Sequence, residues 1–207
     1  SKKWSKILCD NFISSAKQTK KNVFFKDKEI KKFLLKSRLE FNTFYSKKNL
    51  SWSQEASLSR GCYSTIVGII DHGKTIEILA IGDSIALWRE KNTIIKSFFI
   101  KNNHNFFNKP TLLCNIASND KYFFEEFNIS WSSIKIQKSS ILDGDIFLLT
   151  DALAERIFSL INQKKFNLVI EILKKNYKEF ENWLLNERSK SLVKKDDTTV
   201  VWIKIND

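Results

Sequence analysis

The chain has 207 residues, of which 43% are hydrophobic and 28% charged, and its formal net charge at pH 7 is +12. This composition excludes a disordered chain, and the length suits one domain, which we expect to span residues 1–207. No apolar run reaches the ~18 residues that a membrane-spanning helix requires, and no signal-peptide pattern is present. We therefore expect a cytoplasmic protein without a membrane partner.

The positive charge is spread along the chain. Lysine pairs recur, among them Lys2-Lys3, Lys20-Lys21, Lys31-Lys32, Lys164-Lys165 and Lys194-Lys195. Specific nucleic-acid-binding proteins cluster their basic residues, so this spread favours solvated surface lysine and no specific nucleic-acid partner. A basic nucleic-acid-binding domain remains an alternative on charge alone. A positive field also attracts phosphorylated substrates.

The cysteines and histidines show no metal or nucleophile pattern. Cys9, Cys62 and Cys114 form neither a CxxC pair nor a zinc-binding spacing. We expect reduced, buried thiols, as in a cytosolic protein. His72 lies in the sequence Asp-His-Gly-Lys and is interpreted as a turn residue.

The N-terminal third is predicted to be helical. Apolar residues at three- and four-residue steps predict amphipathic helices over 3–15 and 27–47. A third, short helix is expected over 51–58, opened by Ser51 or Ser53. After Gly61 the pattern changes to β-branched and apolar runs.

The middle of the chain is predicted to be a meander of antiparallel strands. These strands are expected over 62–70, 75–81, 85–89 and 93–100, with a further strand over 129–137. The segment 101–128 contains the one proline, Pro110, and many Asn and Phe residues. We interpret it as a long loop with little structure of its own.

The C-terminal part begins with a turn signal, Asp143-Gly144, before a short buried strand over 146–149. Helices are predicted over 152–161, 166–175 and 177–187, and a final strand over 198–205. This order of elements is not the β-α-β alternation of a parallel sheet. It favours an α+β class in which helices cover antiparallel sheets.

Acidic residues lie at the ends of three predicted strands. Asp83 follows the strand over 75–81, Asp151 follows the strand over 146–149, and Asp196 and Asp197 precede the final strand. If these ends converge, the oxygen ligands would favour Mg²⁺ or Mn²⁺. Glu155, four residues after Asp151, would share its helical face. The alternative is that Asp151 only caps the helix that follows.

Four motifs carry a resemblance to a known family. They are Gly-Cys-Tyr-Ser-Thr-Ile-Val-Gly at 61–68, Ile-Gly-Asp-Ser at 81–84, Asp-Gly-Asp-Ile-Phe-Leu-Leu-Thr-Asp-Ala at 143–152, and Asp-Asp-Thr-Thr-Val-Val at 196–201. In order and spacing they resemble the motifs of the type 2C, metal-dependent protein serine/threonine phosphatases. The resemblance implies two antiparallel sheets sandwiched between helix layers, and the predicted helix over 3–15 is similar to the first long helix of the family.

The resemblance also implies residue roles. Asp151 matches an acid that ligates a catalytic metal, and Asp196 matches the acid of the last metal-binding motif, with Asp197 where Asn is usual. Asp83 matches an acid linked to a further, weaker metal, and Glu155 lies where the second acid of that site would be. The implied cofactors are two Mn²⁺ or Mg²⁺ ions, which activate a water molecule that hydrolyses phosphoserine or phosphothreonine.

The departures from the family pattern leave a second hypothesis open. Ala152 stands where the family usually has Gly, and the N-terminal Asp-Gly motif and phosphate-binding Arg are not found. We expect the chain to begin just after that motif, with the first strands upstream, and expect the printed chain to have little or no activity. The first hypothesis is a monomeric phosphatase whose partners are a phosphoprotein and a cognate serine/threonine kinase or its targets. The alternative is a pseudophosphatase that binds a phosphoprotein.

Overall fold

The structure, a computed structural model, describes residues 2–18, 27–90, 95–98, 112–116 and 132–205. Its helices are α1 (Lys2–Gln18), α2 (Asp27–Ser46), α3 (Trp52–Ser59), α5 (Asp151–Asn162), α6 (Phe166–Leu173) and α7 (Tyr177–Ser189), with a short 3-10 helix at Lys138–Ser140. Its strands are β1 (Tyr63–Ser64), β2 (Ile66–Asp71), β3 (Thr75–Ile81), β4 (Ile85–Glu90), β5 (Ile95–Phe98), β6 (Leu113–Cys114), β7 (Ser132–Gln137), β8 (Ile141–Leu149) and β9 (Val200–Lys204).

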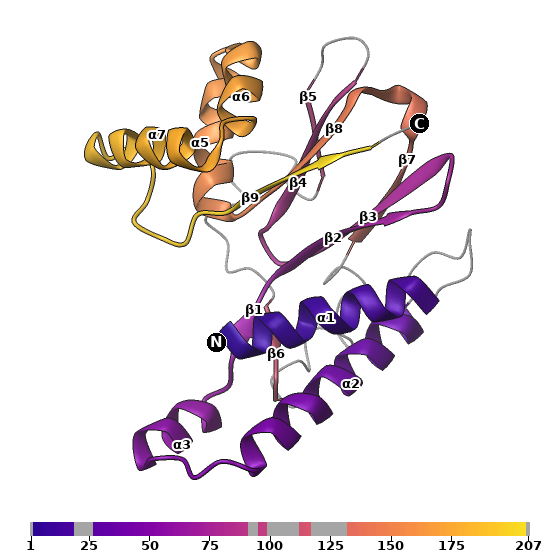
Figure 1. Ribbon diagram of the computed structural model, residues 1–207, viewed down its shortest axis with the longest axis vertical. Helices are drawn as coiled ribbons and strands as arrows, with labels where there is room; N and C mark the ends of the chain where they lie inside the picture. Colours follow the sequence, from indigo (N-terminus) through magenta and orange to yellow (C-terminus); the bar gives the residue numbers. More distant parts are fainter. Residues whose placement is uncertain (1, 19–26, 91–94, 99–111, 117–131, 206–207) are drawn as a thin grey trace.

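The elements are arranged in layers, with α1 and α2 on one side of two sheets and α5, α6 and α7 on the other (Figure 1). The sheet next to α1 has the strand order β2-β3-β7, and the sheet next to α5 has the order β5-β4-β8-β9. Every pairing within them is antiparallel. The predicted α+β fold, with antiparallel sheets between helix layers, is confirmed.

The alternation of side chains along the strands produces three packed interfaces. On β4, Ile85 and Leu87 face the cluster formed with α5 and α6, whereas Ala86 and Trp88 face the other sheet. The third cluster joins α1 and α2 to β2 and β3. Each strand face thus belongs to a separate part of the core.

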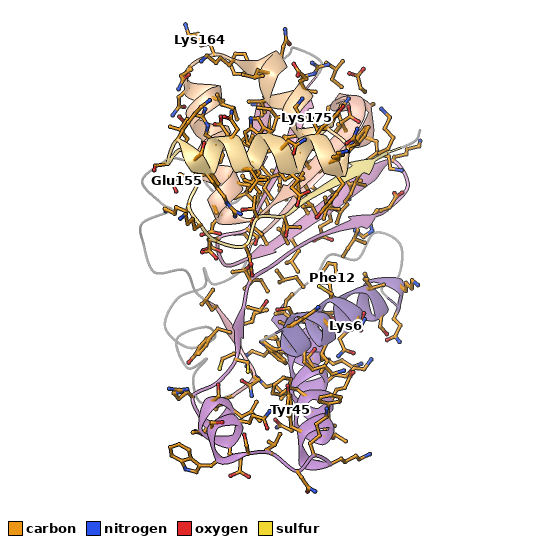
Figure 2. The ribbon with its side chains drawn as sticks, turned by 60° about the vertical axis from the view of Figure 1, so that its left-hand side comes forward. Lys6, Phe12, Tyr45, Glu155, Lys164 and Lys175 are labelled. Carbon is orange, nitrogen blue, oxygen red and sulfur yellow. The ribbon has the colours of Figure 1, made fainter. Side chains whose placement is uncertain are left out.

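The N-terminal helices pack as their apolar spacing predicts. Trp4, Ile7, Leu8 and Phe12 are all buried on one face of α1. Gly68 of β2 permits close approach, because a Cβ at this position would lie 2.5 Å from the Phe12 ring. Figure 2 labels Phe12 on the side of α1 that faces the sheets.

The structure corrects the prediction for the start of the C-terminal part. β8 is longer than the predicted strand, and Asp143 and Gly144 lie within it instead of in a turn before it. Both have positive φ angles, 57° and 64°. The register of β8 against β4 shifts between Trp88 and Glu90. The turn signal therefore marks a bulge, which bends a strand without ending it.

Several local predictions were also wrong. The segment predicted to be a long loop contains β6, which pairs with β1; the rest of it, apart from residues 112–116, lies outside the described residues. Of the cysteines, Cys114 is buried but Cys9 is exposed. His72, by contrast, lies in the predicted turn between β2 and β3, where its amide donates to the Thr75 carbonyl at 2.8 Å. Its side chain is buried, and its Nε2 atom lies 3.1 Å from Oε2 of the buried Glu77. Within the described part of the chain, no helix is both long and apolar enough to cross a membrane.

Candidate functional site

Asp151 lies where β8 gives way to α5. Thr150 is the N-cap residue, with extended backbone angles, and Asp151 is the first residue of the helix. The hydroxyl of Thr150 accepts a hydrogen bond from the Thr199 amide at 3.0 Å and donates one to the Asp197 carbonyl at 3.2 Å. The alternative interpretation of Asp151 as the cap is therefore wrong. The Thr150 contacts hold the start of α5 against the segment that leads into β9.

Asp83 reaches the same region from the turn between β3 and β4. Gly82 has a φ of 98°, and a Cβ there would lie 2.3 Å from Cγ2 of Thr65. Thr65 and Ser84 share a hydrogen bond of 2.8 Å between their hydroxyls. These contacts hold the turn close to the start of β2 and leave the Asp83 side chain half-buried.

The electrostatics of Asp83 indicate that the three strand-end acids lie near one another. Burial raises the pKa of Asp83, and the carboxylates of Asp151 and Asp196 raise it further. An acid shifts in this direction when like charges surround it. The strand register agrees: Ile85 of β4 pairs with Leu149 of β8, and Leu149 pairs with Val200 of β9, so the acids that the sequence placed at three separate strand ends lie at one edge of the sheet.

Glu155 projects from the second turn of α5, at the edge of the upper helical layer in Figure 2. Its Oε2 atom forms an ion pair of 2.7 Å with Nζ of Lys194. The hydrogen bond to Glu155 raises the pKa of Lys194, and the charges of Asp151 and Asp196 raise it further. Lys194 is thus part of the acidic region, although the sequence suggested only a solvated lysine pair. Its position two residues before Asp196 was the available signal.

Arg188 fixes the segment that carries Asp196, and an ion pair beside it joins the helices. Arg188 of α7 donates to the carbonyl of Asp196 and, at 2.8 Å, to the hydroxyl of Thr198. Next to it, Nε of Arg156 lies 2.5 Å from Oε2 of the buried Glu187, which joins α5 to α7. The backbone of Asp196 is therefore held by α7, which is itself held against α5.

The donor chemistry of the region suits a hard divalent cation, because Asp83, Asp151 and Asp196 offer only carboxylate oxygens. Their spacing does not complete a metal site. In the described ranges, no group of three or more His, Cys, Asp or Glu side chains is placed to hold a metal ion. Glu155, the fourth predicted ligand, is paired with Lys194. The three acids therefore suit a hard cation by the chemistry of their oxygen donors.

Comparison with known proteins identifies the fold. No protein-family model matches the chain, and no curated protein matches it by sequence. Among solved structures, it is similar to the serine/threonine phosphatase Stp1 from Staphylococcus aureus, with 18% identity and a TM-score of 0.54 over 98% of this chain and 77% of that one. A bacterial serine phosphatase gives 15% identity and a TM-score of 0.54 over 96% and 77%. At these identities the likeness concerns the fold.

Proposed function

We propose that this protein is a metal-dependent phosphatase that hydrolyses phosphoserine or phosphothreonine in proteins. The observation that carries the proposal is the convergence of Asp83, Asp151 and Asp196 at one edge of the sheet, where Ile85 of β4 pairs with Leu149 of β8 and Leu149 pairs with Val200 of β9. The charges of Asp151 and Asp196 add to the cost of ionising Asp83 there. A cation relieves that cost. The similarity of the fold to bacterial serine/threonine phosphatases supports the same function.

In this proposal, Asp151 and Asp196 would hold a catalytic Mn²⁺ or Mg²⁺ ion, and Asp83 would hold a further one. A divalent cation there supplies Lewis acidity toward a phosphoryl group and makes water a better nucleophile at neutral pH. Thr150 and Arg188 act as positioning residues, because they fix the backbone on either side of the acids. Glu155 and Lys194 set the local charge beside them.

A second candidate function is a non-catalytic relative that binds a phosphoprotein. It is favoured by the Glu155–Lys194 ion pair, which occupies a predicted ligand, and by the incomplete ligand spacing of the described acids. Ala152, where the family usually has Gly, points the same way. Such a protein would bind phosphopeptides without turning them over.

Hydrolysis of p-nitrophenyl phosphate by the protein as its gene encodes it tests the proposal. We expect turnover with Mn²⁺ and none with EDTA. We also expect Asp151→Asn to lower kcat at least about a hundredfold, because a lost metal ligand removes the stabilisation of transition-state charge. Asp10→Asn, an exposed acid paired with Lys6 on α1, is the control. A folded protein without metal-dependent turnover would instead favour the binding function.

A further inference from the structure

A hollow of about 450 Å³ lies directly beside the acidic region, between α5, α7 and the segment that follows α7. Glu155 and Lys194 form its border with that region, and Ser159 and Ser191 contribute hydroxyls to its lining. A second hollow of about 750 Å³ adjoins it, because both are lined by Arg188, Ser191 and Lys195. Asp196 of the candidate metal site lines the second hollow, so the first hollow is continuous with that site through the second.

The side chains that line the first hollow carry more positive than negative charge. Arg156, Arg188, Lys194 and Lys195 line it, against the single carboxylate of Glu155. Two of these cations are neutralised, because Arg156 pairs with Glu187 at 2.5 Å and Lys194 pairs with Glu155 at 2.7 Å.

The other two cations keep their charge. Arg188 donates to neutral acceptors, the Asp196 carbonyl and the Thr198 hydroxyl. Within the residues that the structure describes, no carboxylate forms an ion pair with Arg188 or Lys195. Two positive charges and two hydroxyl groups thus surround a space large enough for a side chain. Asp196 and Asp197 line the second hollow and not the first.

We infer that this hollow, lined by Arg188, Lys195, Ser159 and Ser191, binds an anionic side chain of the phosphoprotein substrate. The inference rests on the proposed function, since it assigns a subsite next to the reacting phosphate. The ligand is a carboxylate or a second phosphate on the same peptide as the phosphoserine or phosphothreonine, because the adjoining hollow reaches Asp196. Guanidinium, ammonium and hydroxyl donors are the groups that recognise such anions.

The test compares two phosphopeptides that differ only in having glutamates or glutamines around the phosphoserine. We expect the wild type to prefer the acidic peptide in kcat/KM, and Lys195→Ala to reduce that preference about fivefold, as for loss of one partly exposed ion pair. Lys195→Glu should reverse the preference. Each rate is divided by the same variant's rate on p-nitrophenyl phosphate. A diphosphorylated peptide distinguishes a second phosphate from a carboxylate as the ligand.

Lys190→Ala is the matched control, because it removes the same charge from the exposed end of α7 without touching either hollow. The inference would be overturned if the wild type, Lys195→Ala and Lys195→Glu all showed the same preference between the two peptides while still hydrolysing p-nitrophenyl phosphate. That result would leave the proposed function standing. If no variant hydrolyses p-nitrophenyl phosphate, the proposed function fails. Fluorescence anisotropy of the labelled peptides then decides the inference: a preference for the acidic peptide that Lys195→Glu abolishes supports it, and equal affinities overturn it.

Discussion

At the scale of single residues, ionising Asp83 costs free energy, because its carboxylate is partly buried and lies near other acids. Its carboxylate is half-buried and faces the charges of Asp151 and Asp196. A residue that serves only the fold gains nothing from this arrangement, because an amide would avoid the repulsion. The cost is the one that the proposed cation would relieve.

Asp83→Asn should therefore stabilise the protein in EDTA at pH 7. Discounting for solvent screening, we expect about 0.5 kcal/mol, or an increase in Tm of about 1–2 °C. Because the folded-state pKa of Asp83 is raised, the cost of ionising it is present above that pKa and absent below the unfolded value of about 4. The gain should therefore vanish as the pH falls below about 4. Scanning fluorimetry in EDTA at pH 7 and pH 3.5 measures it.

Asp71→Asn is the matched control for that measurement. The Asp71 carboxylate is partly desolvated, which raises its pKa, but hydrogen bonds from Lys138 and the Gly73 amide outweigh this and lower it. Its substitution should lower Tm at pH 7, opposite to Asp83→Asn. A decrease in Tm for both variants would contradict the repulsion among the acids.

Lys194 provides a second residue-scale prediction. Its ammonium group pairs with Glu155 and lies within reach of the charges on Asp151 and Asp196. A bound divalent cation would compete with this internal cation. Lys194→Ala should therefore bind Mn²⁺ about fivefold more tightly, by calorimetry, since one ion pair of this kind is worth up to about 1 kcal/mol. Lys190→Ala is again the control, and unchanged or weaker Mn²⁺ binding by Lys194→Ala would disprove competition.

At the scale of elements, Asp145 connects β8, β9 and α6. Its buried carboxylate accepts hydrogen bonds from Trp202 at 2.9 Å and Lys204 at 3.3 Å, and it pairs with Lys174. Burial raises the pKa of Asp145, but the hydrogen bonds from Lys174 and Trp202 outweigh it, so that the pKa is lowered. One side chain thus fixes β9 against β8 and ties α6 to the sheet.

Asp145→Asn should destabilise the protein by about 2 kcal/mol at pH 7, because it leaves charged donors without their acceptor, and Tm should fall by about 4–8 °C. The folded-state pKa is depressed, so the stabilisation is present above the unfolded pKa of about 4 and is lost as the pH falls through the folded value. Urea unfolding at pH 7 and pH 3 tests this. Asp143→Asn, which affects an exposed pair with Arg89, should cost far less at pH 7.

At the scale of the whole molecule, most helices and strands were predictable, because their signals are local. Apolar spacing defined α1, and β-branched runs defined β3. The pairing of β6 with β1 was not predictable, since it joins two-residue strands about fifty positions apart. The bulge at Asp143 was mistaken for a turn, because the same residue types adopt positive φ angles in both.

The candidate site also has one part that was predictable from the sequence and one part that was not. The sequence places Asp83, Asp151 and Asp196 at strand ends, and antiparallel topology brings those ends together. The Glu155–Lys194 pair and the hollow beside it depend on how the segment after α7 returns to α5. No local pattern encodes that return. The part of the site that depends on strand topology was therefore predictable, and the part that depends on loop conformation was not.

The hydrogen bonds between Thr150 and residues 197–199 have a consequence for synthesis of the protein. The acids at 83 and 151 leave the ribosome long before the acid at 196. Until residues 196–204 have emerged and paired with β8, nothing holds Asp196 beside Asp151. A nascent chain can thus assemble the α1 layer and the β2-β3-β7 sheet while Asp196 remains apart from Asp151. The acidic region is therefore complete only after residues 196–204 have emerged, so a shorter nascent chain lacks the contacts that hold Asp196 in it.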